Sequence, residues 1–254
     1  MTTRKLLTAF GITLLATCST LAQQKPGTLA SLEFQTPKNG MVKQYEDGRK
    51  QKAAWHKEQK DTQPLLVWET ISGDHTGTYT VGRLDQHWAD LDKPSVPDQA
   101  DLETYNKLIG ASVQTLVIRY YNLLPKASKP PDTPGFTKYS EIFTYQVRPG
   151  KEDDFRGAIV RATEAIEKTK WPTHYFWYEL VNGGPSGTFV LVIPHANWAD
   201  FEDKPEMKPF PDMLKDAFGP TEGESLLKRF DSDTASVNSE IIQFRPDLSY
   251  LPTK

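Results

Sequence analysis

Two stretches of the chain decide its expected fold: PLLVWETISGDHTGTYTVGRLDQHWADLD at 64–92 and HYFWYELVNGGPSGTFVLVIPHANWADFE at 174–202. They align without a gap at an offset of 110 residues. The identical pairs are Glu69/Glu179, Gly73/Gly183, Gly77/Gly187, Thr78/Thr188, Trp88/Trp198, Ala89/Ala199 and Asp90/Asp200. An ungapped match over two strands, a turn and the start of a helix indicates an internal repeat. Residues related by this offset are called equivalent below.

Each copy predicts the same order of secondary structure. Apolar and polar residues alternate in the strands, glycines mark the hairpin turns, and Trp88 and Trp198 open a further helical region. The first copy predicts a strand at 31–36, a helix at 41–60, a hairpin of strands at 65–71 and 78–84, and a last strand at 116–122. In the second copy the same elements are a strand at 141–147, a helix at 151–170, a hairpin of strands at 175–181 and 188–194, and a last strand at 240–245. The order βαββαβ is the ferredoxin-like unit, so the expected class is α+β.

The boundaries of the two copies follow from the same comparison. Near the end of each copy, SVQT at 112–115 matches SVNS at 236–239 at an offset of 124, so the second copy carries about 14 extra residues. We place them within 205–223, which is rich in proline and glycine. The expected organisation is therefore a first repeat at 30–124, a proline-rich linker at 125–138 and a second repeat at 139–250.

Tandem βαββαβ units with aromatic, apolar strands resemble the dimeric α+β barrel superfamily, in which two ferredoxin-like units pack sheet against sheet. The tryptophan at the helix start and the hairpin resemble the NIPSNAP, EthD-like and antibiotic-biosynthesis-monooxygenase branches. The resemblance implies that one chain with two copies forms the barrel alone, as a monomeric pseudo-dimer. It also implies a ligand site between helices and sheet, and in some of these barrels a histidine on the second helix binds haem iron.

The N-terminus has the pattern of an export signal. Residues 1–22 contain two early basic residues, a short apolar run at 6–16 and small residues up to a cleavage site after Ala22. We therefore expect a periplasmic or secreted protein. The alternative is a lipid anchor at Cys18, where LATC resembles a lipobox although its threonine departs from the usual residue. The apolar run is too short to span a membrane, and no longer run follows.

Composition excludes several classes of function. The 254 residues carry a formal net charge of −3, which argues against non-specific nucleic-acid binding. The single cysteine lies in the expected signal, so the folded part has neither a disulfide framework nor a cysteine nucleophile. The glycines follow no phosphate-loop spacing, there is no GxSxG motif, and the five histidines show no metal-binding spacing.

The first helices of the two copies differ in a way that suggests a site. The second has the apolar stripe Phe155, Ala158, Ile159, Ala162 and Ile166, and the equivalent residues in the first are Tyr45, Gly48, Arg49, Lys52 and His56. Because buried charge without partners is costly, a polar stripe facing the sheet either lines a wet pocket or pairs with acids such as Glu69. In the alternative, a small rotation of the helix leaves the basic residues in solvent. The run at 57–61 is expected to be a solvated helix end.

Eight residues are candidates for the site. His56, His87 and Glu69 are the candidates for acid–base catalysis. The candidates for ligand binding are Arg49, Lys52, Trp68, Arg83 and Trp88. Arg83 replaces the equivalent Ile193 and would bind an acidic ligand group. These residues also have structural interpretations. The histidines could lie at the surface or have all their hydrogen bonds satisfied, and the tryptophans could belong to the core. Glu69, which recurs in both copies, could be a residue of the sheet or the partner of a basic side chain.

The leading functional hypothesis is an exported α+β barrel that binds a small molecule in the first repeat. It would work without a cofactor, as an oxygenase or isomerase. One alternative is a non-catalytic cell-envelope or interaction module. The second alternative is haem binding through His56 or His87.

Overall fold

The computed structural model describes residues 27–133, 135–202, 204–205 and 207–252. The expected signal, including Cys18 and Ala22, lies outside this part. The first half contains β1 (Leu29–Pro37), α1 (Val42–Glu58), β2 (Leu66–Ser72), β3 (Tyr79–Gln86), η1 (Trp88–Asp92), α2 (Asp98–Leu108), η2 (Gly110–Ser112) and β4 (Val113–Leu123). After η3 (Pro125–Ala127), the second half contains β5 (Tyr139–Val147), α3 (Glu152–Thr169), β6 (Phe176–Asn182), β7 (Thr188–His195), η4 (Trp198–Phe201), α4 (Phe210–Phe218), α5 (Pro220–Asp233) and β8 (Thr234–Phe244).

The eight strands form a closed barrel in the order β1-β3-β2-β8-β5-β7-β6-β4. Every neighbouring pair is antiparallel. Each half contributes four strands in the ferredoxin-like order, and the halves join where β2 pairs with β8 and β4 pairs with β6. The structure therefore confirms the α+β class with two βαββαβ units in one barrel.

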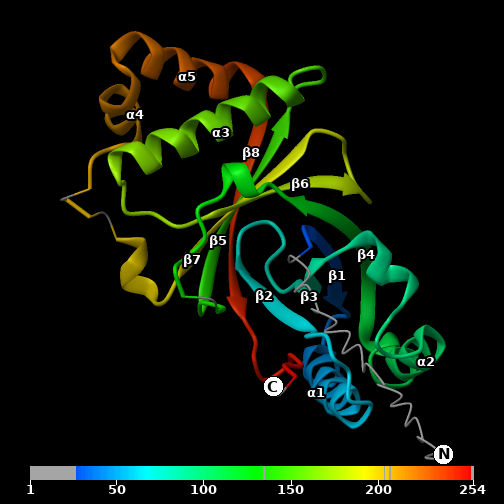
Figure 1. The fold of residues 1–254 in the computed structure, drawn as a ribbon. Coiled ribbons are helices and arrows are strands. Elements are labelled where there is room, and N and C mark those ends of the chain that lie inside the picture. Colours follow the sequence, from blue (N-terminus) through cyan, green and yellow to red (C-terminus); the bar gives the residue numbers. More distant parts are fainter. Residues whose placement is uncertain (1–26, 134, 203, 206, 253–254) are drawn as a thin grey trace, which may run out of the picture.

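The helices lie outside the barrel, with α1 and α2 beside the first half and α3, α4 and α5 together beside the second (Figure 1). The additional helix α4 lies within 205–223, where the extra residues of the second copy were expected. The expected offset of 124 at the last strands is wrong, because β4 begins at Val113 and β8 at Thr234, an offset of 121, so the second copy has about 11 extra residues rather than 14. The tryptophans do not open α-helices, because Trp88 and Trp198 begin the short 3-10 helices η1 and η4. In the first half the α-helix α2 starts only at Asp98.

The two halves are filled differently under their helices. In the second half, α3, α4 and α5 pack on the sheet through one large apolar cluster that includes Phe155, Ile159 and Phe189. In the first half, the corresponding apolar cluster is much smaller and is centred on Tyr45 and Tyr79. The rest of the space under α1 is occupied by polar side chains, and this asymmetry positions the candidate site.

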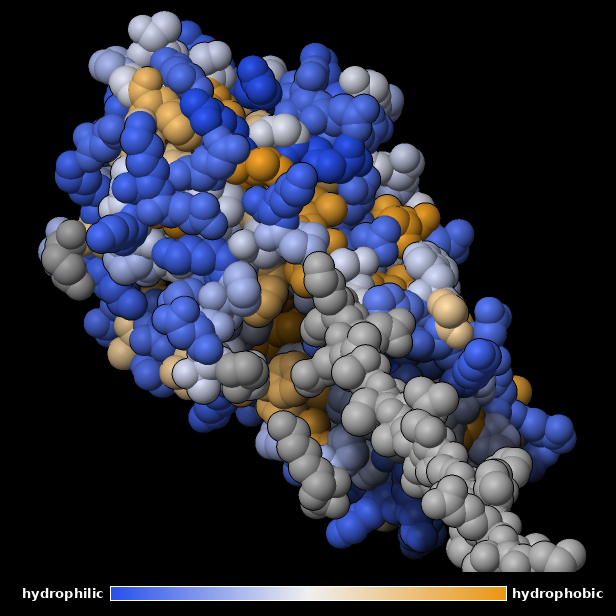
Figure 2. Space-filling model, in the orientation of Figure 1, coloured by the Kyte–Doolittle hydropathy of each residue, from blue (hydrophilic) through white to orange (hydrophobic). Residues whose placement is uncertain are grey.

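Within the part of the chain that is described, none of the helices has the length and apolar character needed to cross a membrane. Figure 2 shows a mostly hydrophilic face, with apolar side chains grouped near the middle of the molecule and beside β6.

Candidate functional site

The polar stripe of α1 faces the sheet, in the same orientation as the apolar stripe of α3. All five members of the stripe are buried, from Tyr45 to His56. A side chain at Gly48 would collide with the Leu108 carbonyl, since a Cβ there would lie 2.3 Å from that oxygen. This close approach of α1 to the end of α2 fixes the helix orientation. The rotated arrangement, with the basic residues in solvent, is therefore wrong.

Arg49 occupies the N-terminal part of this buried face. Its Nε donates to the Tyr45 hydroxyl at 3.1 Å, and an Nη group donates to the Gln35 side chain on β1. Gln35 in turn donates to Glu33. Burial of the Tyr45 hydroxyl raises its pKa to about 12, although the Arg49 charge opposes this shift. Tyr45 therefore remains a neutral hydroxyl at physiological pH.

Lys52 lies one turn further along α1 and reaches α2. Its Nζ donates to both the carboxylate and the backbone carbonyl of Asp101, each at 2.6 Å. Burial lowers the pKa of Lys52, and the Asp101 carboxylate opposes that shift. The side chain of Asp101 is partly exposed, so this carboxylate connects a buried cation to the surface.

His56 and Asp61 form the centre of the site. The His56 and Asp61 side chains are 1% and 0% exposed, and Nδ1 of the ring lies 2.8 Å from the carboxylate. Asp61 also accepts hydrogen bonds from Arg83 at 2.9 Å, from the Gln63 amide at 2.9 Å and from the Ser95 hydroxyl. Burial alone would raise the pKa of Asp61, but these four donors hold it well below its usual range.

The expectation that 57–61 is solvated is wrong at Asp61. The chain reverses at Lys60, whose φ of 55° is in the left-handed region, and the Asp61 amide donates to the His56 carbonyl at 3.0 Å. This turn at the end of α1 places the Asp61 side chain under the helix rather than in solvent.

The second nitrogen of the His56 ring is left without a partner. Asp61 is ionised and accepts the Nδ1 proton, so in the neutral ring Nε2 is an acceptor. It is buried with no hydrogen-bond partner among the described residues, and the nearest carboxylate oxygen is Asp101 Oδ1 at 3.4 Å. Tyr250 covers the ring from the C-terminal segment, with ring centroids 5.8 Å apart. The Tyr250 hydroxyl donates to the Asp61 carbonyl at 2.6 Å, so the pair is shielded from water.

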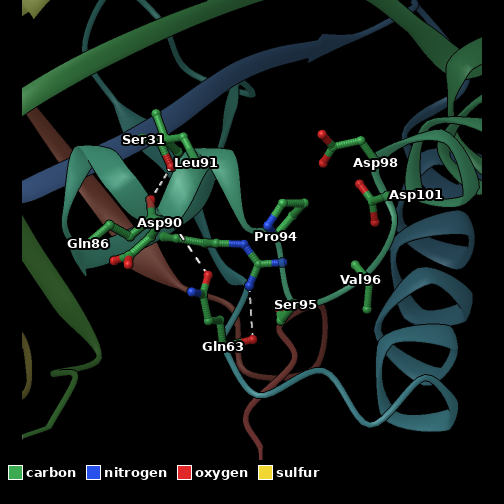
Figure 3. Close-up of a pocket in the computed structure, with 11 residues that line it drawn as sticks. Ser31, Gln63, Gln86, Asp90, Leu91, Pro94, Ser95, Val96, Asp98 and Asp101 are labelled. Atoms are coloured by element: carbon green, nitrogen blue, oxygen red, sulfur yellow. Dashed lines mark hydrogen bonds between the residues drawn. The ribbon is translucent and has the colours of Figure 1, made fainter.

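A cavity of about 160 Å³ adjoins this network. It lies between β1 and β3 on one side and η1, the following loop and α2 on the other, and Figure 3 shows Asp98 and Asp101 opposite Ser31 and Gln86. It is lined by Ser31, Gln63, Arg83, Gln86, Asp90, Leu91, Pro94, Ser95, Val96, Asp98 and Asp101. Most of these side chains are polar, and three of them are carboxylates.

Arg83 connects the cavity to the buried pair. One Nη donates to the backbone carbonyls of Gln63 and Pro64 at 2.9 and 3.1 Å, and the other donates to Asp61. Its Nε has no partner among the described residues, and the side chain lines the cavity. The guanidinium is therefore fixed in position with a donor to spare.

Asp98 is the carboxylate at the cavity that is free to bind a ligand. Its side chain has no hydrogen bond or ion pair to the described residues, unlike that of Asp101, which Lys52 binds. The third carboxylate, Asp90, accepts a bond from the His87 amide at 2.7 Å. A ligand in the cavity would therefore meet one fixed cationic donor and at least one unpaired anionic acceptor.

The structure places four of the eight predicted residues in this network, namely Arg49, Lys52, His56 and Arg83. The acids that pair with them are Asp61 and Asp101, and the expectation that Glu69 pairs with the stripe is wrong. Glu69 accepts a bond from Arg245 at 2.6 Å, as the equivalent Glu179 does from Arg156 at 2.7 Å. Both glutamates thus fix other segments to the sheet.

The other three predicted residues do not line the cavity. Trp68 packs with Phe136 and Phe244 at ring distances of 6.0 and 5.9 Å. Trp88 is half exposed and packs on Tyr120 at 5.5 Å. His87 precedes η1, and its amide is bound by the Asp90 carboxylate.

Asp61, Ser95 and Asp101 belong to the site but were not predicted from the sequence. A signal for Asp61 was present, because its equivalent is Trp171, so an acid replaces an aromatic residue just where His56 replaces Ile166. Ser95 and Asp101 lie beyond the aligned stretch, in a loop and a helix whose position depends on the tertiary fold. Only the structure brings them to the pocket.

Comparisons with solved structures agree with this architecture. A monooxygenase-like protein from Lactobacillus acidophilus has a TM-score of 0.52 at 8% identity, with 90% of this chain and 97% of that chain covered. An anthrone oxidase-like protein gives 0.52 at 13% identity, covering 91% and 95%. A mutant chlorite dismutase from Candidatus Nitrospira defluvii gives 0.51 at 10% identity, covering 89% and 93%.

These likenesses define the class of protein: a barrel of two ferredoxin-like units in one chain. The chain shares the dimeric α+β barrel fold with these proteins, and its own strand order has this arrangement. No protein-family model and no curated protein matches it. At these identities the comparisons concern the fold alone, so function must be argued from the site.

The residues around His56 do not fit a haem. One ring nitrogen is bound to Asp61 and the other faces Asp101, with no open side from which iron could approach. The adjoining cavity, at about 160 Å³, is smaller than the roughly 300–1,000 Å³ of ordinary ligand sites. Within the described ranges, no group of three His, Cys, Asp or Glu side chains could hold a metal ion.

Proposed function

We propose that the chain binds a small polar molecule in the cavity between β3 and α2. The observation that carries this proposal is the fixed guanidinium of Arg83. Arg83 and Asp98 both line the cavity, and among the described residues neither the Arg83 Nε nor the Asp98 carboxylate has a partner. If Arg83 and Asp98 served only to stabilise the fold, we would expect their polar groups to point into the protein and to be paired there. The equivalent of Arg83 is Ile193 in an apolar core, so the fold itself does not require a cation there.

The chemistry of the cavity indicates the class of ligand. Arg83 Nε–H offers a donor to a carboxylate or another acceptor, and the Asp98 carboxylate offers an acceptor to an ammonium or hydroxyl group. The volume of about 160 Å³ holds about five water molecules at roughly 30 Å³ each. The best match is a small zwitterion or amino alcohol rather than a large aromatic compound.

The buried pair supports a second candidate function, proton transfer to and from the bound ligand. Asp101 lines the cavity and lies 3.4 Å from His56 Nε2, and Asp61 holds the opposite ring nitrogen. For a ligand with a carboxylate, a proton removed from the neighbouring carbon would pass to Asp101 and then to His56, while the electron pair moves onto the carboxylate oxygens as an enolate that Arg83 would stabilise. Return of the proton on another atom would complete an isomerisation without a cofactor.

Oxygenase chemistry and a non-catalytic role are the competing hypotheses. The monooxygenase-like neighbours favour an oxygenase only through a shared fold, and fold does not determine function. A non-catalytic module would need none of the unused polar groups that line the cavity. For these reasons we favour ligand binding with proton transfer.

We further propose that residues 1–22 direct export and are removed after Ala22, which would place the barrel in the periplasm or outside the cell. Mass determination of the purified protein from the cell envelope tests this. A chain that starts at Gln23 supports the proposal, a lipid-modified chain that starts at Cys18 supports the alternative, and an intact N-terminus contradicts both.

Binding can be tested by NMR on the Arg83 side chain. Glycine presents both a carboxylate and an ammonium group, whereas acetate and methylamine each present one of them. We expect glycine to shift the Arg83 Nε–H resonance at lower concentration than either half-ligand. Arg83→Ile, which introduces the residue of the second repeat, should abolish binding, and Asp98→Asn should reduce the affinity for glycine to that for acetate.

The control is Arg161→Ile, which removes a partly exposed arginine on α3. It should leave glycine binding unchanged. If the Arg83 resonance responds to none of the three molecules at tens of millimolar, the binding proposal is wrong. Proton transfer is tested separately, as exchange of the glycine Cα protons with deuterium from solvent. His56→Gln should stop this exchange and leave glycine binding within twofold.

A further inference from the structure

The C-terminal tail, residues 245–250, follows the last strand of the second repeat but packs against the first. Figure 1 shows it passing from β8 to the side of α1. Leu248 is 2% exposed and belongs to the small apolar cluster under α1. Tyr250 exchanges two backbone hydrogen bonds, of 2.8 and 2.9 Å, with Leu65 just before β2. The tail is therefore part of the core of the first repeat.

The segment 124–129, which follows β4, is the counterpart of this tail at the offset of 121 between β4 and β8. Lys129 likewise exchanges two backbone hydrogen bonds with Tyr175, each of 2.9 Å. In both segments a serine hydroxyl, of Ser249 or of Ser128, accepts from a strand amide at 2.9 Å. The two segments therefore hold matching positions in the two repeats, and their side chains can be compared one by one.

The segments differ in the side chain that reaches the turn after the first helix. In the first repeat, the Tyr250 hydroxyl donates to the Asp61 carbonyl at 2.6 Å. In the second, the Lys129 ammonium donates to the equivalent Trp171 carbonyl at 2.7 Å. Because either donor satisfies this carbonyl, the fold does not require an aromatic ring here. What Tyr250 adds is its ring, which lies over the His56 imidazole with centroids 5.8 Å apart and planes inclined by 22°.

This ring occurs only in the repeat that has the buried pair. Three neighbouring residues change together between the repeats, from His56, Asp61 and Tyr250 in the first to Ile166, Trp171 and Lys129 in the second. The His56 residue is 1% exposed, and the Tyr250 residue stacked on it is 7% exposed. The Tyr250 ring is therefore part of the surroundings that separate His56 from solvent.

We propose that Tyr250 is a positioning residue of the site. Its ring keeps water away from the His56–Asp61 pair and holds the imidazole with Nε2 toward the Asp101 carboxylate, 3.4 Å away. The functional part of this inference rests on the proton transfer proposed above. Transfer to Nε2 requires that Nδ1 keep its proton on Asp61, because that bond fixes the tautomer, and water beside the pair would compete for the carboxylate. The end of the second repeat thus completes the site of the first.

The Nδ1 proton of His56 measures this shielding in the ligand-free protein. It can be followed by NMR with labelled histidine, and His56→Gln identifies its resonance among the five histidines. Tyr250→Phe keeps the ring and loses the hydroxyl, whereas Tyr250→Met loses both, so a difference between these two variants is due to the ring. We expect the Nδ1 proton to exchange with water within about threefold of the wild-type rate in Tyr250→Phe, and about tenfold faster or more in Tyr250→Met.

Tyr250→Lys is the variant that preserves the fold, because Lys129 shows that a lysine supplies the hydrogen bond at this position. Without the ring, its Nδ1 proton should exchange with water as fast as in Tyr250→Met. In the deuterium assay on glycine, Tyr250→Met should slow the labelling of Cα about tenfold, whereas Tyr250→Phe should not. Glycine binding should stay within twofold in both variants, because the residues that line the cavity are unchanged.

Equal exchange of the Nδ1 proton in Tyr250→Phe and Tyr250→Met overturns the proposal, as does a wild-type protein in which His56 gives no Nδ1 proton resonance. Faster exchange of that proton without slower labelling of glycine overturns the positioning role. The measurement on the Nδ1 proton needs no ligand. A protein that neither binds glycine nor labels it would therefore contradict the proposed function, while the shielding by Tyr250 would still be decided by this proton.

Discussion

Replacing Asp61 by alanine is the most direct test of the polar core. The carboxylate accepts four hydrogen bonds, and two come from the basic side chains of His56 and Arg83. Its side chain is 0% exposed, so water cannot replace the lost oxygens without opening the structure. Asp61→Ala therefore leaves the mostly buried Arg83 cation and the buried His56 ring nitrogen without their acceptor.

The magnitude follows from the removal of one partner of a buried ion pair, which costs about 3–5 kcal/mol. We expect the free energy of unfolding to fall by this amount at neutral pH. With a urea m-value of about 3 kcal/mol/M for a chain of this size, the midpoint should fall by about 1–1.7 M.

Urea unfolding followed by tryptophan fluorescence measures this change. The control is Asp247→Ala, which also removes an aspartate paired with an arginine, Arg245 at 3.0 Å. The Asp247 side chain is 46% exposed, so its loss should cost less than about 1 kcal/mol.

The reasoning is refuted if Asp61→Ala lowers the free energy of unfolding by less than 1 kcal/mol, or by no more than Asp247→Ala. Equal effects would mean that the buried acceptor adds nothing beyond a surface ion pair. A change in m-value together with the midpoint would indicate a loosened native state, and hydrogen exchange in α1 would then locate it.

Three further predictions concern the same network. Because the native pKa of Asp61 lies below its unfolded value, its stabilisation is present above about pH 4 and is lost below it, so the urea midpoint should fall more steeply there in wild type than in Asp61→Ala. The triple variant His56→Ile, Asp61→Leu, Arg83→Ile should unfold at higher urea than Asp61→Ala, since apolar sets can replace buried ion pairs, but its NMR spectrum should not respond to glycine. In a haemin titration, any change in the Soret band should be the same in wild type and in His56→Ile. A Soret change that is lost in His56→Ile would show that His56 binds haem and would contradict our conclusion that its surroundings do not fit a haem.

Most of the fold could be predicted because its signals are local and repeated. Strand alternation, hairpin glycines and the tryptophan after each hairpin recur at a fixed offset, and each observed strand begins and ends within a few residues of its expected range, apart from the longer β4 and β8. Closure of the barrel did not follow from these patterns. It depends on β2 meeting β8 and β4 meeting β6, contacts between residues far apart in the chain.

Only those residues of the candidate site that have an equivalent in the second repeat could be predicted from the sequence. The comparison of α1 with α3 identified Arg49, Lys52 and His56 because each replaces a small or apolar residue of the second copy. The acids that pair with them could not be found in this way. Asp61 turns inward only because the chain reverses at a left-handed residue, and Asp101 belongs to a helix outside the aligned segment.

The two halves act as an internal comparison of what the scaffold requires. The second shows that apolar side chains can fill the space between the first helix and the sheet, with Ile166 and Ile193 in place of His56 and Arg83. Since buried ion pairs are commonly no more stabilising than well-packed apolar residues, stability alone does not explain the polar set of the first half. Some of its charged side chains also line a cavity, and two polar groups of these lining residues, the Arg83 Nε and the Asp98 carboxylate, have no partner among the described residues. A ligand that binds these groups would explain why the first half is polar under its helix and why the second half, which has no such ligand, is apolar there.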